Sequence, residues 1–293
     1  MTALTNSTAR VNPTVIAVRA GFKRGRIELI QTLTNGMDVF SQFFWPVATM
    51  VAVFFMRHGD FQGTGLALGA LALPSVLGMI VAFTGMFGVA QGLAMDREDG
   101  TLLRAKATPN GMLGYLIGKV VAVSGTTLVQ VVLILGFGLI AIGGVSLDSV
   151  GAWATLIGIL VLGLLACLPL GAVIGSAFDS PRSIGFVSFP IMGLVAISGI
   201  FYPITGLPGW LQAVAQVFPI YWLGLGMRSA MLPDSAATVE LSHSWRHLET
   251  VAVLGAWAVL GFVLAPIVLR RMARRESGAA VAARRERAMQ RAY

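Results

Sequence analysis

The sequence predicts an all-α polytopic membrane protein with six transmembrane helices, an N-terminal interfacial helix and a re-entrant helical pair after the fifth span. Three observations predict this class. Hydrophobic residues make up 56% of the 293 residues and charged residues only 12%, whereas soluble domains carry about 25% charged residues. Several apolar runs reach the roughly 20 residues that a helix needs to cross a bilayer. Basic residues gather at the ends of these runs, as in oriented membrane proteins.

Residues 1–36 are predicted to be a cytoplasmic segment that contains one amphipathic helix. Residues 1–12 are polar and lack the apolar centre of a signal peptide, so the first span is expected to act as its own membrane signal. Over 13–34, apolar residues recur at helical spacing beside basic residues, which is typical of a helix lying in the membrane interface. A short soluble lead-in helix is the alternative. The apolar positions are Val15, Val18, Phe22, Leu29 and Leu33, and the basic ones Arg19, Lys23 and Arg26.

Residues 37–271 are predicted to form the transmembrane domain, and 272–293 a basic cytoplasmic tail. The six spans are expected at 37–56, 68–95, 112–143, 151–177, 184–202 and 249–269. The third run is longer than a span requires, so its first turns, around Lys119, are expected at or below the interface. The single cysteine, Cys167, lies inside an apolar run and excludes an internal disulfide; it is interpreted as a small packing residue.

The basic residues predict that both termini face the cytoplasm. They concentrate in the N-terminal segment, in the loops after the second and fourth spans, and in the tail; the opposite side carries only Arg57, Arg228 and Arg246. In a soluble protein a net charge of +8 would suggest nucleic-acid binding. Here the positions of the charges indicate membrane orientation, so nucleic acid is not an expected partner.

The stretch 203–233 is apolar but is broken by Pro203, Pro208, Pro219 and Pro233. Such a segment cannot form one lipid-facing helix, so we expect two short helices dipping into the outer leaflet. This stretch and the residue before it contain aromatic residues of the kind that favour the membrane interface: Tyr202, Trp210, Tyr221 and Trp222.

The chain lacks the motifs of an ATPase and the charges of an ion-driven carrier. Its only Gly-Lys pair, at Lys119, is followed by Val120, and Leu113 stands where a P-loop has its first glycine. The spans hold few ionisable groups, with Asp38 and Lys119 near their cytoplasmic ends, whereas ion-coupled carriers need intramembrane ligands. His243 and His247 have metal-binding spacing, but Ser244 breaks any H-E-x-x-H pattern. No catalytic site, metal or cofactor is therefore expected in this chain.

One charged segment, 96–109, follows the second span directly. Gly100 permits a sharp turn, and Thr101 is expected to cap a short helix. Taken alone, these charges fit either a solvated loop or a contact with a partner.

Three pieces of sequence, in this order and spacing, resemble the type-2 ABC exporter permeases, in particular the bacterial drug-resistance branch of the daunorubicin-exporter kind. The resemblance covers about 36–271. The pieces are AQGLAMDREDGTL at 90–102, ATP at 107–109 followed by YLIGKV at 115–120, and SGIFYP at 198–203 with LPGWL at 207–211 and later Pro219 and Arg228.

The resemblance implies an exporter subunit in the bacterial inner membrane that hydrolyses no ATP itself. It implies two copies of a separate ABC ATPase, which bind ATP and Mg, and a second permease, identical or paralogous, surrounded by membrane lipids. The segment after the second span would be a coupling helix inserted into the ATPase, with its contact made by Asp96, Arg97, Glu98, Asp99, Gly100, Thr101, Leu102 and Arg104. The broken segment, with Tyr202, Pro203, Pro208 and Trp210, would be the family's extracellular re-entrant pair.

The resemblance also implies a substrate path between two permeases, lined by the first, second and fifth spans. Candidates for the lining are Phe43, Phe83, Phe87, Phe186, Phe189 and Phe201; for each, lipid contact or core packing is the alternative. An uncharged path suits drug-like or lipid-like amphipathic cargo. Export of a lipid or lipid-linked glycan, or a non-transporting scaffold, are the alternative functions.

Overall fold

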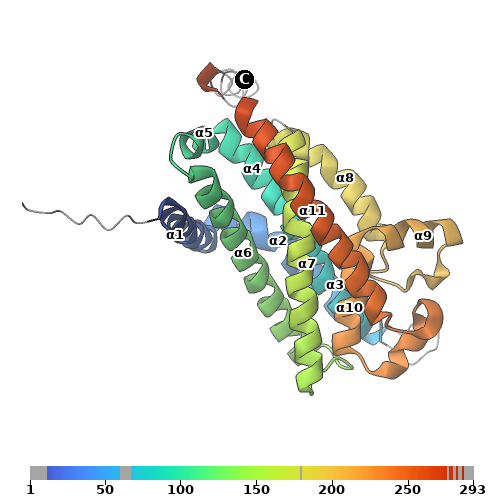
Figure 1. Ribbon diagram of the computed structural model, residues 1–293. Coiled ribbons are helices and arrows are strands. Elements are labelled where there is room, and N and C mark those ends of the chain that lie inside the picture. The colour runs from blue at the N-terminus through green and yellow to red at the C-terminus, as the bar shows by residue number, and fades with distance from the viewer. Residues whose placement is uncertain are drawn as a thin grey trace, which may run out of the picture.

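The computed structural model describes residues 12–59, 67–178 and 180–275, together with 277–279, 282 and 286. Every regular element in these ranges is a helix, which confirms the all-α prediction. The long helices pack into one bundle in which α7 (Val150–Ala177) and α11 (His247–Arg275) lie side by side (Figure 1).

The predicted N-terminal helix is α1 (Pro13–Thr34). The side chain of Asn12 accepts a hydrogen bond from the Thr14 N–H, and Asn35 in the same way caps α2 (Gly36–Phe55), because asparagine side chains satisfy the free N–H groups at helix starts. α1 packs along the first half of α6 (Gly111–Ala141) (Figure 1). Its location in the membrane interface remains a prediction.

Small residues bring α1 and α6 close together. A Cβ placed on Gly21 would lie 2.6 Å from the Gly114 carbonyl oxygen, and one on Gly25 would lie 2.5 Å from that of Gly118. These glycines are spaced four residues apart on both helices, the small-xxx-small pattern by which membrane helices approach closely. A larger side chain at any of them would push the two helices apart.

Among the residues that the structure describes, five helices are long and apolar enough to cross a membrane: Gly36–His58, Leu68–Glu98, Gly111–Ala141, Val150–Ala177 and His247–Arg275. The first joins α2 to a 3-10 turn (Met56–His58). The second joins α3 (Leu68–Phe83), a π-helical turn (Thr84–Gly88) and α4 (Val89–Glu98). The short helix α5 (Thr101–Lys106) connects α4 to α6.

The predicted fifth span is the shorter apolar helix α8 (Pro181–Ile197), of 17 residues. It ends five residues before the predicted 202, because the chain turns at Gly199, whose φ of +69° lies in the left-handed region. Among the described residues, five helices therefore have the length and composition of a span. The count of six spans remains a prediction.

The segment after α8 contains two helices, as expected: α9 (Gly209–Val217) and α10 (Pro219–Met231). Three 3-10 turns flank them, Ile204–Gly206, Asp234–Val239 and Leu241–His243. α10 packs inside the bundle against α3 and α7. A Cβ on Gly78 would lie 2.7 Å from the Gly224 nitrogen, so a glycine of α3 allows this approach. Whether the pair dips into a bilayer remains a prediction.

The four aromatic residues expected at the interface divide into two groups. Trp210 is 68% exposed and Tyr202 38%, as interface residues should be. Tyr221 and Trp222 are buried in the core because the helix that carries them, α10, packs inside the bundle. These two residues therefore do not face lipid.

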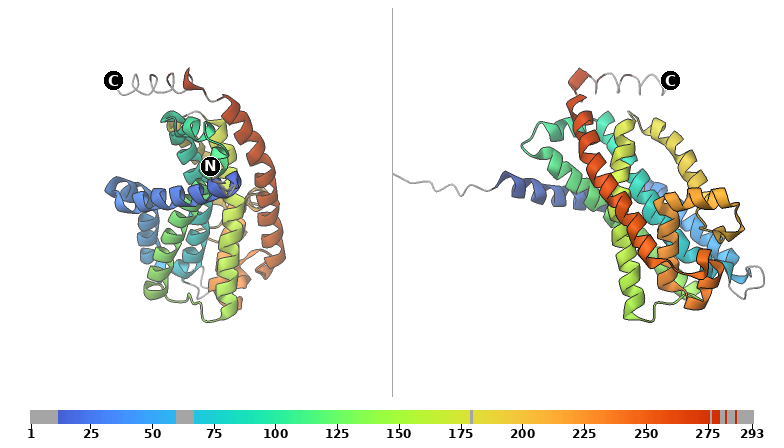
Figure 2. Two further views of the ribbon diagram at one scale, coloured as in Figure 1. Left: turned by 60° about the vertical axis from the view of Figure 1, so that its left-hand side comes forward. Right: turned by 45° about the vertical axis from the view of Figure 1, so that its right-hand side comes forward.

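The bundle is unevenly packed. α3 and α10 are almost wholly buried, whereas of the residues of α2, all of which the structure describes, only Val53 is buried. The views in Figure 2 show α2 and α8 at the outside of the bundle. α2 therefore has an apolar face that no other described part of the chain covers.

Candidate functional site

The charged segment forms a sharp corner between α4 and α5. Gly100 takes a φ of +77°, which a side chain would disfavour. Asp99 Oδ1 accepts a hydrogen bond from the Thr101 N–H at 2.7 Å. The cap expected from Thr101 is therefore supplied by Asp99, and the Thr101 hydroxyl instead accepts from the Arg104 guanidinium at 2.9 Å.

Part of the corner is fixed to the bundle. Leu102 is buried in a cluster that includes Leu93 of α4, Tyr115 of α6 and Leu269 of α11. Arg97 is also buried and donates to the Phe178 carbonyl at 2.8 Å, which joins the end of α4 to the end of α7. These two predicted contact residues face inward.

The rest of the corner faces outward. Asp99 and Arg104 are exposed, and Glu98 and Thr101 are partly exposed, around the buried Gly100. Within the described part of the chain, the carboxylate of Glu98 takes part in no ion pair. The corner therefore presents charge of both signs at one end of the bundle (Figure 1).

Asp96, the first predicted contact residue, belongs to a buried charge cluster between three helices. Its Oδ2 accepts from Tyr115 Oη at 2.8 Å and lies 2.8 Å from Lys119 Nζ, while its Oδ1 lies 3.7 Å from the Arg24 guanidinium. Lys119 Nζ also contacts Glu28 Oε1 at 2.5 Å. We call Arg24, Glu28, Asp96, Tyr115 and Lys119 the α1–α4–α6 cluster.

The cluster was not predicted from the sequence, where Lys119 was expected at or below the membrane interface. The side chain of Lys119 is only 7% exposed, and two carboxylates compensate its charge, as burial of a charge requires. A signal was present: Arg24 and Glu28 are four residues apart beside Gly21 and Gly25, and Tyr115 and Lys119 repeat that arrangement beside Gly114 and Gly118.

The π-helical turn between α3 and α4 is held by a glutamine. Thr84 Oγ1 donates to Gln130 Oε1 at 2.9 Å, and Gln130 Nε2 donates to the Gln42 carbonyl of α2, also at 2.9 Å. Gln130 is buried in an otherwise apolar part of α6. Single π turns within α-helices are frequent at functional sites, and this one lies in the helix that leads to the corner.

Comparison with known proteins decides the family. The model of the ABC-2 family transporter protein matches residues 32–267. The chain belongs to this family. It is thus a multi-pass membrane protein of the ABC-2 transporter family.

Among curated proteins, the chain is similar to the "Probable multidrug ABC transporter permease YbhR" of Escherichia coli strain K12 and of E. coli O157:H7. Each is 25% identical over 192 residues, which cover 65% of this chain and 51% of the relative. The chain thus spans about half the length of the curated relatives it matches. The resemblance to ABC exporter permeases is confirmed at the level of the family, and the daunorubicin-like branch remains a proposal.

The phenylalanines predicted to line a path in this ABC-2 protein are distributed over several elements. Phe43 of α2 is partly exposed, and Phe186 and Phe189 of α8 are 69% and 72% exposed. Phe83 directly precedes the π turn and Phe87 lies within it, and the two rings stack with centroids 5.2 Å apart. Phe201 is partly buried against the main core. These positions fit either a path or contact with lipid.

A second buried charge pair lies at the opposite end of the bundle. The Arg228 guanidinium contacts Glu240 through Nε–Oε1 at 2.6 Å and Nη2–Oε2 at 3.1 Å. Its Nη1 donates to Ser75 Oγ at 2.6 Å and to the Gly199 carbonyl at 3.0 Å. Arg228 therefore joins α10, α3 and the turn after α8. The sequence had singled out Arg228 but not Glu240, because 3-10 turns without a periodic pattern surround Glu240.

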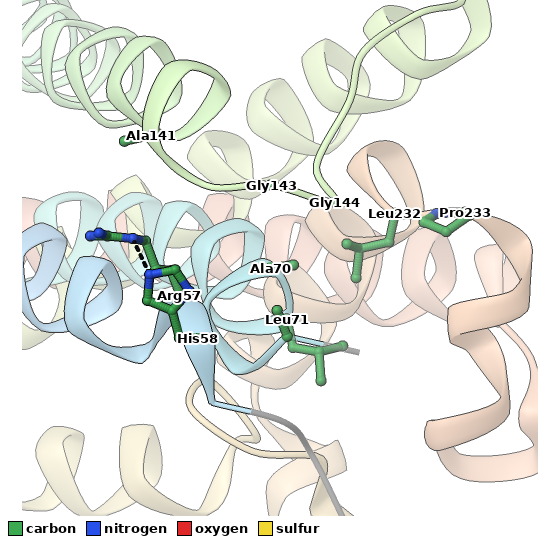
Figure 3. Close-up of a pocket in the computed structure, with 10 residues that line it drawn as sticks. Arg57, His58, Ala70, Leu71, Ala141, Gly143, Gly144, Leu232 and Pro233 are labelled. Carbon is green, nitrogen blue, oxygen red and sulfur yellow. Dashed lines mark hydrogen bonds between the residues drawn. The ribbon is translucent and has the colours of Figure 1, made fainter. Parts of the chain in front are cut away.

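A cavity lies near the same end (Figure 3). Arg57 and His58 line one side, joined by a hydrogen bond of 3.0 Å, and Gly144, Leu232 and Pro233 line another. Residues 60–66 lie outside the described residues. No ligand is assigned to this cavity.

Proposed function

We propose that this chain is the transmembrane permease of an ATP-driven exporter that moves amphipathic or hydrophobic compounds, drug-like or lipid-like, out of the cell. A separate ABC ATPase, in two copies that bind ATP and Mg, would supply the energy. The observation that carries the proposal is the α4–α5 corner, which presents charges outward and is tied to the bundle by Arg97 and Leu102.

The geometry divides the predicted coupling residues by role. Glu98, Asp99, Thr101 and Arg104 have surface that a partner can reach. Asp96, Arg97 and Leu102 point into the bundle, so they would pass a displacement of the corner to its neighbours. Because Asp96 contacts Lys119 and, through it, Glu28, the coupling segment would move together with α1 and α6.

The π turn supplies a place where the second span can bend. Its residues, Thr84–Gly88, separate the corner half of the helix from the half that is packed on α10. Phe83 directly precedes the turn and Phe87 belongs to it, so bending there would reshape the predicted path.

A second permease, identical or paralogous, would cover the apolar face of α2 and complete the path. Exposed phenylalanines on α8, at Phe186 and Phe189, would lie in the same interface. The multidrug permeases to which the chain is similar support drug efflux and antibiotic resistance as the biological role. Export of a lipid or lipid-linked glycan by the same architecture is the second candidate, favoured by the apolar surface that Phe186 and Phe189 expose on α8.

The test is transport in proteoliposomes that contain the permease and an ABC ATPase that copurifies with it. Export is expected only with both subunits and ATP, and the permease alone should hydrolyse no ATP. Glu98→Ala is expected to weaken ATPase capture by about 30-fold or more, because losing one member of an interfacial charge pair costs about 2–5 kcal/mol.

The matched control is Glu249→Ala, which removes an exposed glutamate at the start of α11, at the other end of the bundle. It should leave capture and export unchanged. Export at the wild-type level by the Glu98→Ala permease, at equal expression, would show that the corner is a solvated loop and not a contact with the ATPase. A permease that never stimulates the ATPase or moves cargo would favour the scaffold alternative.

A further inference from the structure

The last helix, α11, has one face that is exposed over its whole apolar length. Val259, Val263 and Ile267 are 66%, 55% and 45% exposed and follow one another at four-residue spacing. The opposite face is buried against α7, through residues such as Gly261 and Ala265. In a bilayer, the exposed apolar strip would contact lipid chains.

Three arginines continue this strip without a break. Arg270, Arg271 and Arg274 follow Ile267 by three, four and seven residues, the spacing that keeps side chains on one face of a helix. All three are exposed and lie within α11, which continues to Arg275. No salt bridge in the described part of the chain involves them.

The length of the apolar stretch sets the depth of these arginines. The residues from Val251 to Leu269 include no charged side chain. At 1.5 Å per residue this stretch spans about 28 Å, close to the roughly 30 Å of a hydrocarbon core. Arg270 and Arg271 would therefore stand at the hydrocarbon boundary, and Arg274 one turn further out, where lipid phosphates lie.

We infer that Arg270, Arg271 and Arg274 form a binding surface for the phosphate groups of anionic lipids in the surrounding leaflet. The planar guanidinium donates paired hydrogen bonds to phosphate, and clusters of basic residues beside a membrane helix attract anionic lipids. This inference depends on the membrane location of α11 and not on the proposed transport.

The direction of the arginines favours lipid over a protein partner. Leu269 and Met272 turn to the opposite side, where they join the cluster around Leu102 of α5. The arginine face therefore points away from the α4–α5 corner, where the ATPase is proposed to bind, and toward the lipid that surrounds the apolar strip.

The experiment compares lipids retained by the intact permease. Wild-type protein in nanodiscs of equimolar phosphatidylglycerol and phosphatidylcholine is extracted mildly, and the bound lipids are counted by mass spectrometry. Wild type should enrich phosphatidylglycerol. The variant R270Q/R271Q/R274Q should lose this preference by at least about fivefold, the effect of one basic residue near a membrane surface.

Two further variants and one condition make the result specific. R270K/R271K/R274K should keep most of the enrichment and shows that the helix end folds. K106Q removes an exposed positive charge on α5 and should leave the enrichment unchanged. High salt should lower the wild-type enrichment, since it screens exposed charges. Equal phosphatidylglycerol enrichment in wild type and R270Q/R271Q/R274Q would overturn the inference. If R270Q/R271Q/R274Q lost ATPase capture but kept the wild-type lipid enrichment, this face would be a protein contact, and the inference would again be overturned.

Discussion

Replacing Lys119 with methionine tests the α1–α4–α6 cluster most directly. Methionine keeps the length of the side chain and removes the charge that lies 2.8 Å from Asp96 Oδ2 and 2.5 Å from Glu28 Oε1. The side chain of Lys119 is 7% exposed and that of Asp96 14%, so water screens this pair little. Breaking a buried ion pair from one side costs about 3–5 kcal/mol. Because Asp96 keeps Tyr115 as a donor, we expect a loss of about 3 kcal/mol.

The matched control is Glu28→Gln. Its side chain is 32% exposed, and exposed ion pairs contribute at most about 1 kcal/mol. Free energies of unfolding would be measured by titration with SDS, followed by tryptophan fluorescence. Combining Lys119→Met with Glu28→Gln and Asp96→Asn leaves no uncompensated carboxylate, so part of the loss should be recovered. A loss below about 1 kcal/mol for Lys119→Met, or one equal to that of Glu28→Gln, would refute the buried-cluster reasoning.

Three more predictions concern other parts of the chain. Gly100→Val should abolish export at normal expression, because the φ of +77° at this position costs residues other than glycine about 1–2 kcal/mol. Gly100→Asn should retain export, since asparagine tolerates the left-handed region. Export assays with both variants test this. Glu240→Gln should lower the free energy of unfolding by about 3 kcal/mol, since it leaves the buried Arg228 charge without its carboxylate, and Glu240→Gln with Arg228→Met should cost less in the same SDS titration. If both termini are cytoplasmic, an impermeant maleimide added outside intact cells should label Ser235→Cys and not Asn110→Cys; both positions are exposed, and the reverse pattern would contradict the proposed orientation.

Helix positions were predictable wherever an apolar run stopped at clear turn residues. The fourth span was predicted at 151–177 and is Val150–Ala177, because Ser149 caps its start and a charged loop follows its end. The fifth was predicted to end five residues too late, because the apolar residues continue past Ser198 while the backbone already turns at Gly199. Apolar character marks what can enter a membrane, but it does not by itself mark where a helix ends.

The site was only half predictable, for a related reason. The corner at Gly100 is local, so its glycine and charges are visible within a few residues. The partners of Asp96 are not, since Lys119 and Glu28 come from two other helices and are themselves 91 residues apart in the chain. The pairing of Gly21 and Gly25 with Gly114 and Gly118 was the available signal, because small residues at this spacing predict close approach of helices.

The second span connects the α1–α4–α6 cluster with the Arg228–Glu240 pair, and this connection shows where the span can bend. Ser75, toward one end, accepts from Arg228, and Asp96, toward the other, contacts Lys119; the two are about 31 Å apart along a helix. Separating either network would leave buried charges unpaired, which costs several kcal/mol. The side-chain contact of the π turn between them is one neutral hydrogen bond from Thr84 to Gln130, worth about 1 kcal/mol. A force applied at the corner would therefore bend the helix at Thr84–Gly88 before it breaks the contacts at either end.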